Sequence, residues 1–310
     1  NLSRNLKGLD PDTSYTITVK AIDVYGNVSD PLQSNRFTTP KTNIVDYATA
    51  PNVLKVDFTD TYTKKGYQWA TDKSINKNDV LFNSSLETAT VTYDPIFKKD
   101  VLVLTGEGHR GAPSSEARVS VNSSIFSAQQ LSIETAFSID SDIHPWTLPG
   151  TTKGDKVHDN GKEAHIISTY ENGGYALYYN YTDKKLHFSM YGAKADDYEG
   201  LAAPISLDVP HHVAITFDQN QVKMFLDGQM VASETARYSD GSPIGLLMNP
   251  TMDLFIGADS EGFQDRYNFF KGKVSYVNIF DRGISDAEVA SDYQNFVASL
   301  NGITPAGDQQ

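Results

Sequence analysis

Aromatic and polar side chains alternate along two segments in the middle of the chain, and they form the best candidate for a ligand-binding surface. In the segment 186–191, Leu186, Phe188 and Met190 must share the core face of a strand, because successive side chains of a strand point to opposite faces. His187 and Tyr191 then share the other face. This second face combines rings with groups that form hydrogen bonds.

A second strand is predicted to pair with this segment across a short turn. By the same alternation Tyr178 and Asn180 join the polar face, and His165 and His212 are expected on the same face of neighbouring strands. Aromatic rings stack on the apolar C–H faces of a sugar while polar groups bond its hydroxyls, so this surface suits a carbohydrate. Tyrosine is also a common strand residue, so a purely structural surface is the alternative. The histidine spacings carry no signature of a transition-metal site.

Two tryptophans lie in predicted loops. Exposed tryptophans in loops can anchor a glycan, whereas others close the end of a core. With these two included, the candidate ligand-binding residues are Tyr178, Asn180, His187, Tyr191, His165, Trp146 and Trp69.

Oxygen-bearing side chains at the end of an early strand form a candidate cation site. Asp57 and Asp60 stand in the run Asp-Phe-Thr-Asp. Calcium takes about six to eight oxygen ligands, many of them carboxylates, so Ca²⁺ is the one cofactor that the sequence suggests. Solvated carboxylates in a turn are the alternative.

The usual catalytic constellations are missing from the sequence. It has no cysteine, no Gly-x-Ser-x-Gly, no His-Glu-x-x-His and no phosphate-binding glycine loop. Retaining glycoside hydrolysis needs a pair of carboxylates, and Glu134 stands alone in the segment 132–137. We therefore predict no catalytic residue, with a divergent glycoside hydrolase as the alternative.

Composition narrows the partners and the compartment. The 310 residues include 26 Lys and Arg against 39 Asp and Glu, and the formal net charge of −13 repels nucleic acid and anionic membranes. No stretch approaches the roughly 20 apolar residues of a membrane span. The absence of cysteine excludes disulfides and thiolate metal sites. A disulfide-free exported protein fits a Gram-positive bacterium, so we expect a secreted or cell-surface protein, although a cytosolic protein can equally lack cysteine.

Alternation of apolar and polar residues recurs along nearly the whole chain and predicts an all-β fold. The first strand is expected over 14–22. Asp227-Gly228 between two apolar runs predicts a tight hairpin turn. Three polar segments lack the alternation and are predicted as long loops: 61–78, 106–115 and 140–162.

One short helix is predicted near the C-terminus. Ser285 and Glu288 have the spacing of a capping box, in which each residue satisfies a backbone N–H of the other. Val289, Tyr293 and Phe296 follow at helical spacing. These positions indicate a structural helix.

The N-terminal segment carries a first resemblance to a known family. Gly8-Leu-Asp-Pro-Asp-Thr-Ser-Tyr15, followed by Gly26-Asn27, resembles the second half of a fibronectin type III domain, and Tyr15 stands where that family places its tyrosine corner. Residues 1–40 are too few for its seven strands. The resemblance therefore implies the C-terminal part of such a domain, with the other half upstream, followed by a linker over 41–52.

Residues 53–300 carry a second resemblance. Five segments occur in order, at 54–60, 211–218, 222–231, 254–259 and 270–285. Together they resemble a bacterial laminin-G-like domain of the concanavalin A type. The resemblance implies a jelly-roll β-sandwich of two antiparallel sheets with a concave face and the short C-terminal helix, followed by a tail over 301–310.

The second resemblance also implies a role in recognition. Such modules bind carbohydrates or surface proteins, and in bacteria they often sit beside fibronectin type III domains in exported hydrolases, including calcineurin-like phosphoesterases. Relatives often hold a structural calcium near Asp57, but many carry an Asp where this chain has Ser275, so Asn278, Asp281 or backbone would complete the site. We expect a non-catalytic module that binds a glycan or a cell-surface protein and accompanies an upstream catalytic domain. A purely structural accessory domain is the alternative.

Overall fold

The computed structural model divides the chain into two compact units, Asn1–Ala50 and Pro51–Gln310. The residues that the structure describes are 14–20, 28–34, 36–38, 52–74, 76–108, 113–120, 130–143, 162–170, 173–192, 196–218, 221–244, 247, 250, 252–262 and 265–302. Strands dominate these residues, so the predicted all-β class is confirmed.

The smaller unit contains short antiparallel pairs in its described residues. The pairs are β1 (Ser14–Tyr15) with β4 (Phe37–Thr38) and β2 (Thr18–Val19) with β3 (Leu32–Gln33). The single strand predicted over 14–22 is wrong in its described part, because it is interrupted before β2. At the interruption, the Ile17 N–H donates to the Ser34 hydroxyl at 2.9 Å instead of to a strand partner. The fibronectin type III identity of this unit stays a prediction.

Eight strands of the larger unit, counted over the described residues, form one antiparallel sheet. In spatial order they are β19 (Gln229–Thr235), β18 (Gln221–Leu226), β17 (His211–Asp218), β12 (Gln130–Ile139), β23 (Lys271–Phe280), β10 (Lys99–Thr105) and β9 (Thr90–Asp94), with β5 (Asn52–Val56) also paired to β23. The β18–β19 turn is the predicted one: Asp227 and Gly228 both have positive φ, at 50° and 74°.

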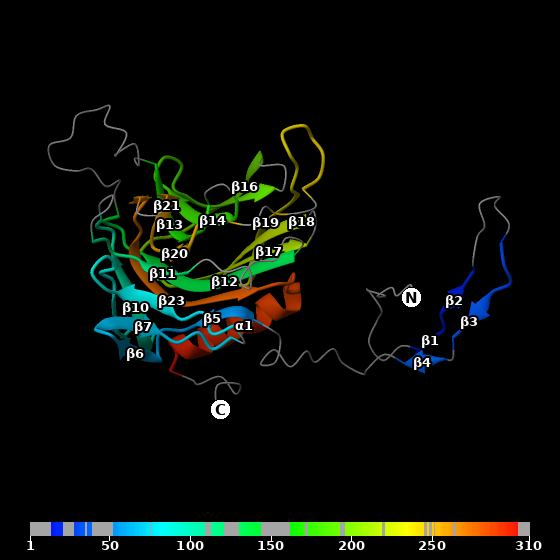
Figure 1. Ribbon diagram of the computed structural model, residues 1–310, viewed down its shortest axis with the longest axis horizontal. Helices are drawn as coiled ribbons and strands as arrows, with labels where there is room; N and C mark the ends of the chain where they lie inside the picture. The colour runs from blue at the N-terminus through cyan, green and yellow to red at the C-terminus, as the bar shows by residue number, and fades with distance from the viewer. Residues whose placement is uncertain are drawn as a thin grey trace. The chain divides into compact units, whose positions relative to one another are not determined.

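Nine strands in the described part of this unit form the second sheet. Their order is β16 (Asp196–Pro204), β15 (Lys185–Gly192), β14 (Tyr175–Asn180), β13 (Glu163–Ser168), β20 (Leu254–Ile256), β11 (Ala117–Val119), β8 (Val80–Asn83), β7 (Tyr67–Ala70) and β6 (Thr61–Lys64). A small hairpin of β21 (Asp259–Gly262) and β22 (Asp265–Tyr267) follows β20. Figure 1 shows the two large sheets as stacked layers.

The β6–β7 hairpin corrects the loop predicted over 61–78. Lys65 and Gly66 adopt positive φ, at 54° and 83°, which closes a two-residue turn whose twist matches that of the strands. The two strands are polar and largely exposed. The apolar alternation that usually marks a strand is therefore weak here.

The two sheets enclose a continuous apolar core. Leu186, Phe188 and Met190 of β15 are completely buried, which confirms their predicted core face. They belong to one cluster with Phe137 and Phe217 of the eight-stranded sheet. Each such side chain stabilises the fold by about 1.5–3 kcal/mol through its removal from water. The alternate residues of β15 must then lie on the outer face of the nine-stranded sheet.

Helix α1 (Asp286–Leu300) covers the outer face of the eight-stranded sheet (Figure 1). Its predicted capping box is confirmed: the Glu288 N–H donates to Ser285 Oγ at 3.2 Å, and the Ser285 N–H donates to the Glu288 carboxylate at 2.7 Å. Val289 and Phe296 are buried, as their spacing predicts. Among the described residues, no helix has both the length and the apolar character needed to cross a membrane.

Candidate functional site

Three rings lie in a row across the outer face of the nine-stranded sheet. Tyr178 of β14 is paired in the sheet with His165 of β13 on one side and His187 of β15 on the other. The Tyr178 ring centroid lies 5.1 Å from that of His165 and 5.3 Å from that of His187, with interplanar angles of 18° and 17°. The structure brings these three residues together as a ring stack. Their role in binding stays a prediction.

A carboxylate lies at each end of the ring stack. Glu163 Oε2 is 3.2 Å from His165 Nε2, and Asp183 Oδ2 is 2.9 Å from His187 Nε2. Burial acts to raise the pKa of Glu163, but the hydrogen bond with His165 and the positive charges of His165, His187 and Lys162 together hold the pKa below its usual value. Each carboxylate has further lone pairs that can accept hydrogen bonds from ligand hydroxyls.

Only part of this face is open to solvent. Tyr178 is 5% exposed and His165 is 2% exposed, whereas the His187 side chain keeps 22% of its surface open. The half-buried residues beside the stack are Asn180, Tyr191 and Tyr170, and the rings of the two tyrosines lie 4.5 Å apart between centroids. A ligand on this face would therefore contact His187 and Tyr191, while Tyr178 and His165 support them.

The two predicted tryptophans do not join the ring stack. Trp69 lies on β7, six strand positions from β15 in the same sheet, which is about 29 Å at about 4.8 Å per strand. A small ligand cannot contact both places. Trp146 lies outside the described residues.

His212 and Glu134 belong to the other sheet. The prediction that His212 shares a face with Tyr178 is wrong, because β17 is a strand of the eight-stranded sheet. His212 Nε2 lies 2.8 Å from Glu134 Oε1, and both side chains are buried beneath α1, where the His212 ring contacts that of Phe296. A substrate cannot reach Glu134 in this arrangement.

Asp57 is paired with a lysine. Its Oδ2 lies 2.8 Å from Lys73 Nζ, and its Oδ1 accepts hydrogen bonds from the N–H and the hydroxyl of Thr59. Burial acts to raise the pKa of Asp57, but these hydrogen bonds and the positive charges of Lys99 and Lys73 together hold it below its usual value. Asp60 is exposed. Within the ranges that the structure describes, no three His, Cys, Asp or Glu residues gather as a metal site would need. Calcium at Asp57 and Asp60 stays a prediction.

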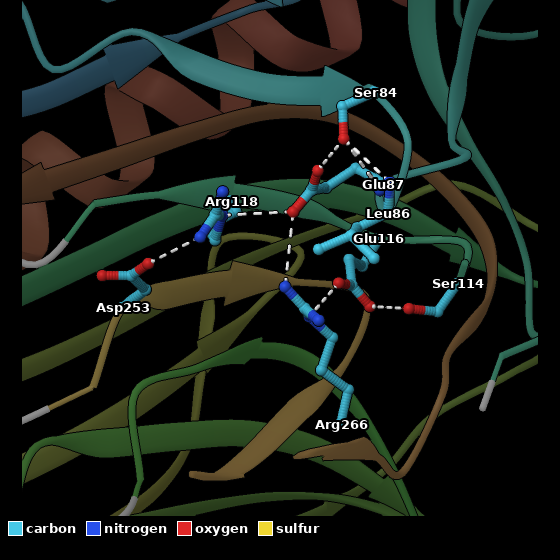
Figure 2. Close-up of polar contacts among 8 residues, drawn as sticks. All are labelled: Ser84, Leu86, Glu87, Ser114, Glu116, Arg118, Asp253 and Arg266. Carbon is cyan, nitrogen blue, oxygen red and sulfur yellow. Dashed lines mark hydrogen bonds and ion pairs between the residues drawn. The ribbon is translucent and has the colours of Figure 1, made fainter. Parts of the chain in front are cut away.

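A charged cluster on the nine-stranded sheet was not predicted from the sequence (Figure 2). Arg266 of β22 pairs with Glu116 through Nε, and its Nη2 lies 3.3 Å from Glu87 Oε1. Arg118 of β11 joins Glu87 at 3.2 Å and Asp253 at 3.3 Å. We call these five residues the arginine cluster.

The centre of the arginine cluster is almost fully buried. Arg266 is 2% exposed, and Glu87 and Glu116 are completely buried. Burial raises the pKa of Glu116 to about 7, although the positive charge of Arg266 opposes the shift. Buried charges are tolerated only when they are paired, so these contacts fix β22 to the sheet.

The sequence predicts the position of only some residues of the arginine cluster. Glu116 and Arg118 flank the core residue Ala117, so the alternation of β11 already directs both to the outer face. Nothing near Arg266 in the sequence indicates its carboxylate partners, which are far away along the chain.

Comparisons with known proteins agree with the fold. Residues 153–290 match the model of a family described as the concanavalin A-like lectin/glucanases superfamily. No curated protein matches the chain. Among solved structures, the chain is similar to the binding domain of Paraclostridial Mosquitocidal Protein 1, with 13% identity, a TM-score of 0.54, and coverage of 79% of this chain and 52% of that one.

Two further similar structures come from botulinum neurotoxins. The serotype G binding domain has 13% identity and a TM-score of 0.51, over 78% of this chain and 50% of that one. The serotype D ligand-binding domain in complex with N-acetylneuraminic acid has 15% identity and a TM-score of 0.52, over 79% of this chain and 50% of that one. The chain spans about half the length of these structures. They confirm the concanavalin A-like jelly roll that the sequence predicts for the larger unit.

Proposed function

We propose that the larger unit is a non-catalytic recognition module that binds a glycan through the outer face of its nine-stranded sheet. The observation that carries the proposal is the ring stack of His165, Tyr178 and His187 with a carboxylate at each end. His187, the accessible ring of the stack, and the neighbouring Tyr191 can stack on the C–H face of a sugar, and the carboxylates can accept hydrogen bonds from its hydroxyls. The similar neurotoxin domain solved with N-acetylneuraminic acid supports a sugar as the class of ligand.

Charge favours a neutral sugar for this chain. The formal net charge of −13 repels anions at long range. Glu163 and Asp183 add carboxylates at the ends of the ring stack. A neutral glycan avoids this repulsion, whereas a sialylated glycan does not.

The wider context of the module is part of the same proposal. Residues 1–40 form the C-terminal part of a fibronectin type III spacer and 41–52 form a linker, in a secreted or cell-surface protein of a Gram-positive bacterium. An exported hydrolase, such as a calcineurin-like phosphoesterase, supplies the upstream catalytic domain. The two sequence resemblances support this arrangement, and a cell-surface protein is the alternative partner.

A glycan array probed with the full chain tests the proposal, followed by titration calorimetry with the sugars that bind. His187→Ala and Tyr191→Ala are expected to weaken binding about tenfold, or by about 1.4 kcal/mol, because each removes a ring that contacts the sugar. Tyr93→Ala is the matched control, since Tyr93 is an exposed tyrosine on β9 of the other sheet. Absence of any sugar binding, or equal loss in the control, contradicts the proposal.

The burial of Tyr178 and His165 favours a second candidate, a structural accessory domain. In that case the ring stack only stabilises the sheet, and the domain positions its upstream neighbour. The array then shows no bound sugar, and Tyr178→Ala lowers the melting temperature without any effect on binding.

A further inference from the structure

The β21–β22 hairpin is tied to two different strands of the nine-stranded sheet. On one side Arg266 belongs to the arginine cluster, whose member Arg118 lies on β11 (Figure 2). On the other side Asp259 accepts a hydrogen bond of 2.6 Å from the Ser168 hydroxyl of β13. We call β21, β22 and the following residue Asn268 the strap. Strand β20 lies between these two attachment strands in the sheet.

The strap accounts for the burial of outward-facing side chains on β20 and β13. The Phe255 ring centroid lies 5.2 Å from the Arg266 guanidinium, and Phe255 is 4% exposed. Ser168, bonded to the strap, is 1% exposed. The His165 N–H donates to the Asn268 carbonyl at 2.8 Å, and its Nε2 lies 3.3 Å from the Asn268 side chain. A ligand on the outer face therefore cannot contact the side chains of Phe255, Ser168 or His165.

Lifting the strap is strongly unfavourable. It would leave Glu87 and Glu116 in the sheet without Arg266. A buried carboxylate that loses its cation is far less stable than the intact pair. A neutral sugar carries no positive charge that could replace Arg266 beside these carboxylates. It therefore binds while the strap stays attached to the sheet.

We infer that the strap limits the ligand of the proposed function to a short glycan, or to the terminal units of a longer one, and excludes a polysaccharide that runs across the sheet. This inference rests on the proposed function. The partly exposed outward-facing side chains of β15, His187 and Tyr191, lie about 14 Å apart at about 3.4 Å per residue, and Ser189 between them is 1% exposed. Trp69 lies on the far side of the strap attachments, so it does not contact the same ligand.

Titration calorimetry of the unaltered full chain with an oligosaccharide series tests the inference. The probes are homo-oligomers of N-acetylglucosamine, of galactose and of glucose, each from monomer to hexamer. Affinity is expected to rise from monomer to trimer and then to change by less than about twofold, because the strap ends the contact surface. An affinity that keeps rising to the hexamer, by about tenfold over the trimer, overturns the inference but leaves the proposed function intact.

Two variants give an independent check with the best-binding trimer. His187→Ala is expected to weaken binding about tenfold, whereas Trp69→Ala leaves it within about twofold of the wild type. Equal losses in the two variants, with both folded by thermal melting, overturn the inference. If no sugar in the array or the series binds, the proposed function fails and the inference fails with it.

Discussion

The Glu134 carboxylate and the His212 ring lie together beneath helix α1, with Glu134 Oε1 2.8 Å from His212 Nε2. Glu134 Oε2 also accepts a hydrogen bond from the Asn278 amide at 3.4 Å. Burial and the negative charges of Glu134 and Glu288 raise the pKa of Asp292 to about 8, against a smaller opposite effect of Lys55.

The raised pKa of Asp292 predicts a stability that falls as the pH rises. The ordinary pKa of Asp292 is 3.8, so between about pH 4 and pH 8 the folded chain holds a proton that the unfolded chain has lost. Its contribution to the free energy of unfolding therefore falls through this window, by up to about 1.4 kcal/mol per pH unit, and is constant above it. Asp292→Asn should remove that slope, because the amide is neutral at every pH and does not titrate.

Urea unfolding of both chains at several pH values measures the slope. Asp286→Asn is the control, because Asp286 is an exposed carboxylate in the first turn of the same helix. It should keep the pH dependence of the wild type. If Asp292→Asn also keeps it, Asp292 is not the group responsible for the slope.

Features that depend on neighbouring residues could be predicted from the sequence. The core face of β15, the capping box of Ser285 and Glu288, and the turn at Asp227 each depend on positions only a few residues apart. Alternation and capping act over such distances, so the local sequence contains the whole signal.

Features that depend on distant strand pairing could not be predicted. Alternation directs both His212 and Tyr178 away from the core, but it does not say which sheet each strand joins. That choice depends on the pairing of β17 with β12, and it places His212 beside Glu134. Arg266 is a similar case, because its burial is stable only beside Glu87 and Glu116, which come from distant segments.

The calcium prediction can be tested on the unaltered chain. If Ca²⁺ binds at Asp57 and Asp60, adding it should raise the melting temperature, because a ligand of the folded state stabilises that state by mass action. Chelation should reverse the rise. Lys73→Ala removes the ammonium that now pairs with Asp57 and should strengthen the effect. A melting temperature that does not respond to calcium in either chain contradicts the site.

The arginine cluster predicts a large and pH-dependent effect of Arg266→Met. Removing the guanidinium leaves two buried carboxylates without it, which should lower the free energy of unfolding by about 3–5 kcal/mol at pH 8. Burial raises the pKa of Glu116 to about 7 from an ordinary value of 4.5, and loss of Arg266 raises it further. Above about pH 7 the folded variant therefore holds a proton that the folded wild type has lost, so its deficit should shrink as the pH falls toward about 7 and level off below it.

Urea unfolding at pH 5.5 and at pH 8 measures this deficit, with Lys223→Met as the matched control. Lys223 pairs with Asp286 at 2.7 Å, but the Asp286 side chain is 60% exposed. Exposed ion pairs contribute about 0–1 kcal/mol, so the control should lose little at either pH. A loss in Arg266→Met as small as that of the control would show that the cluster does not hold the strap to the sheet.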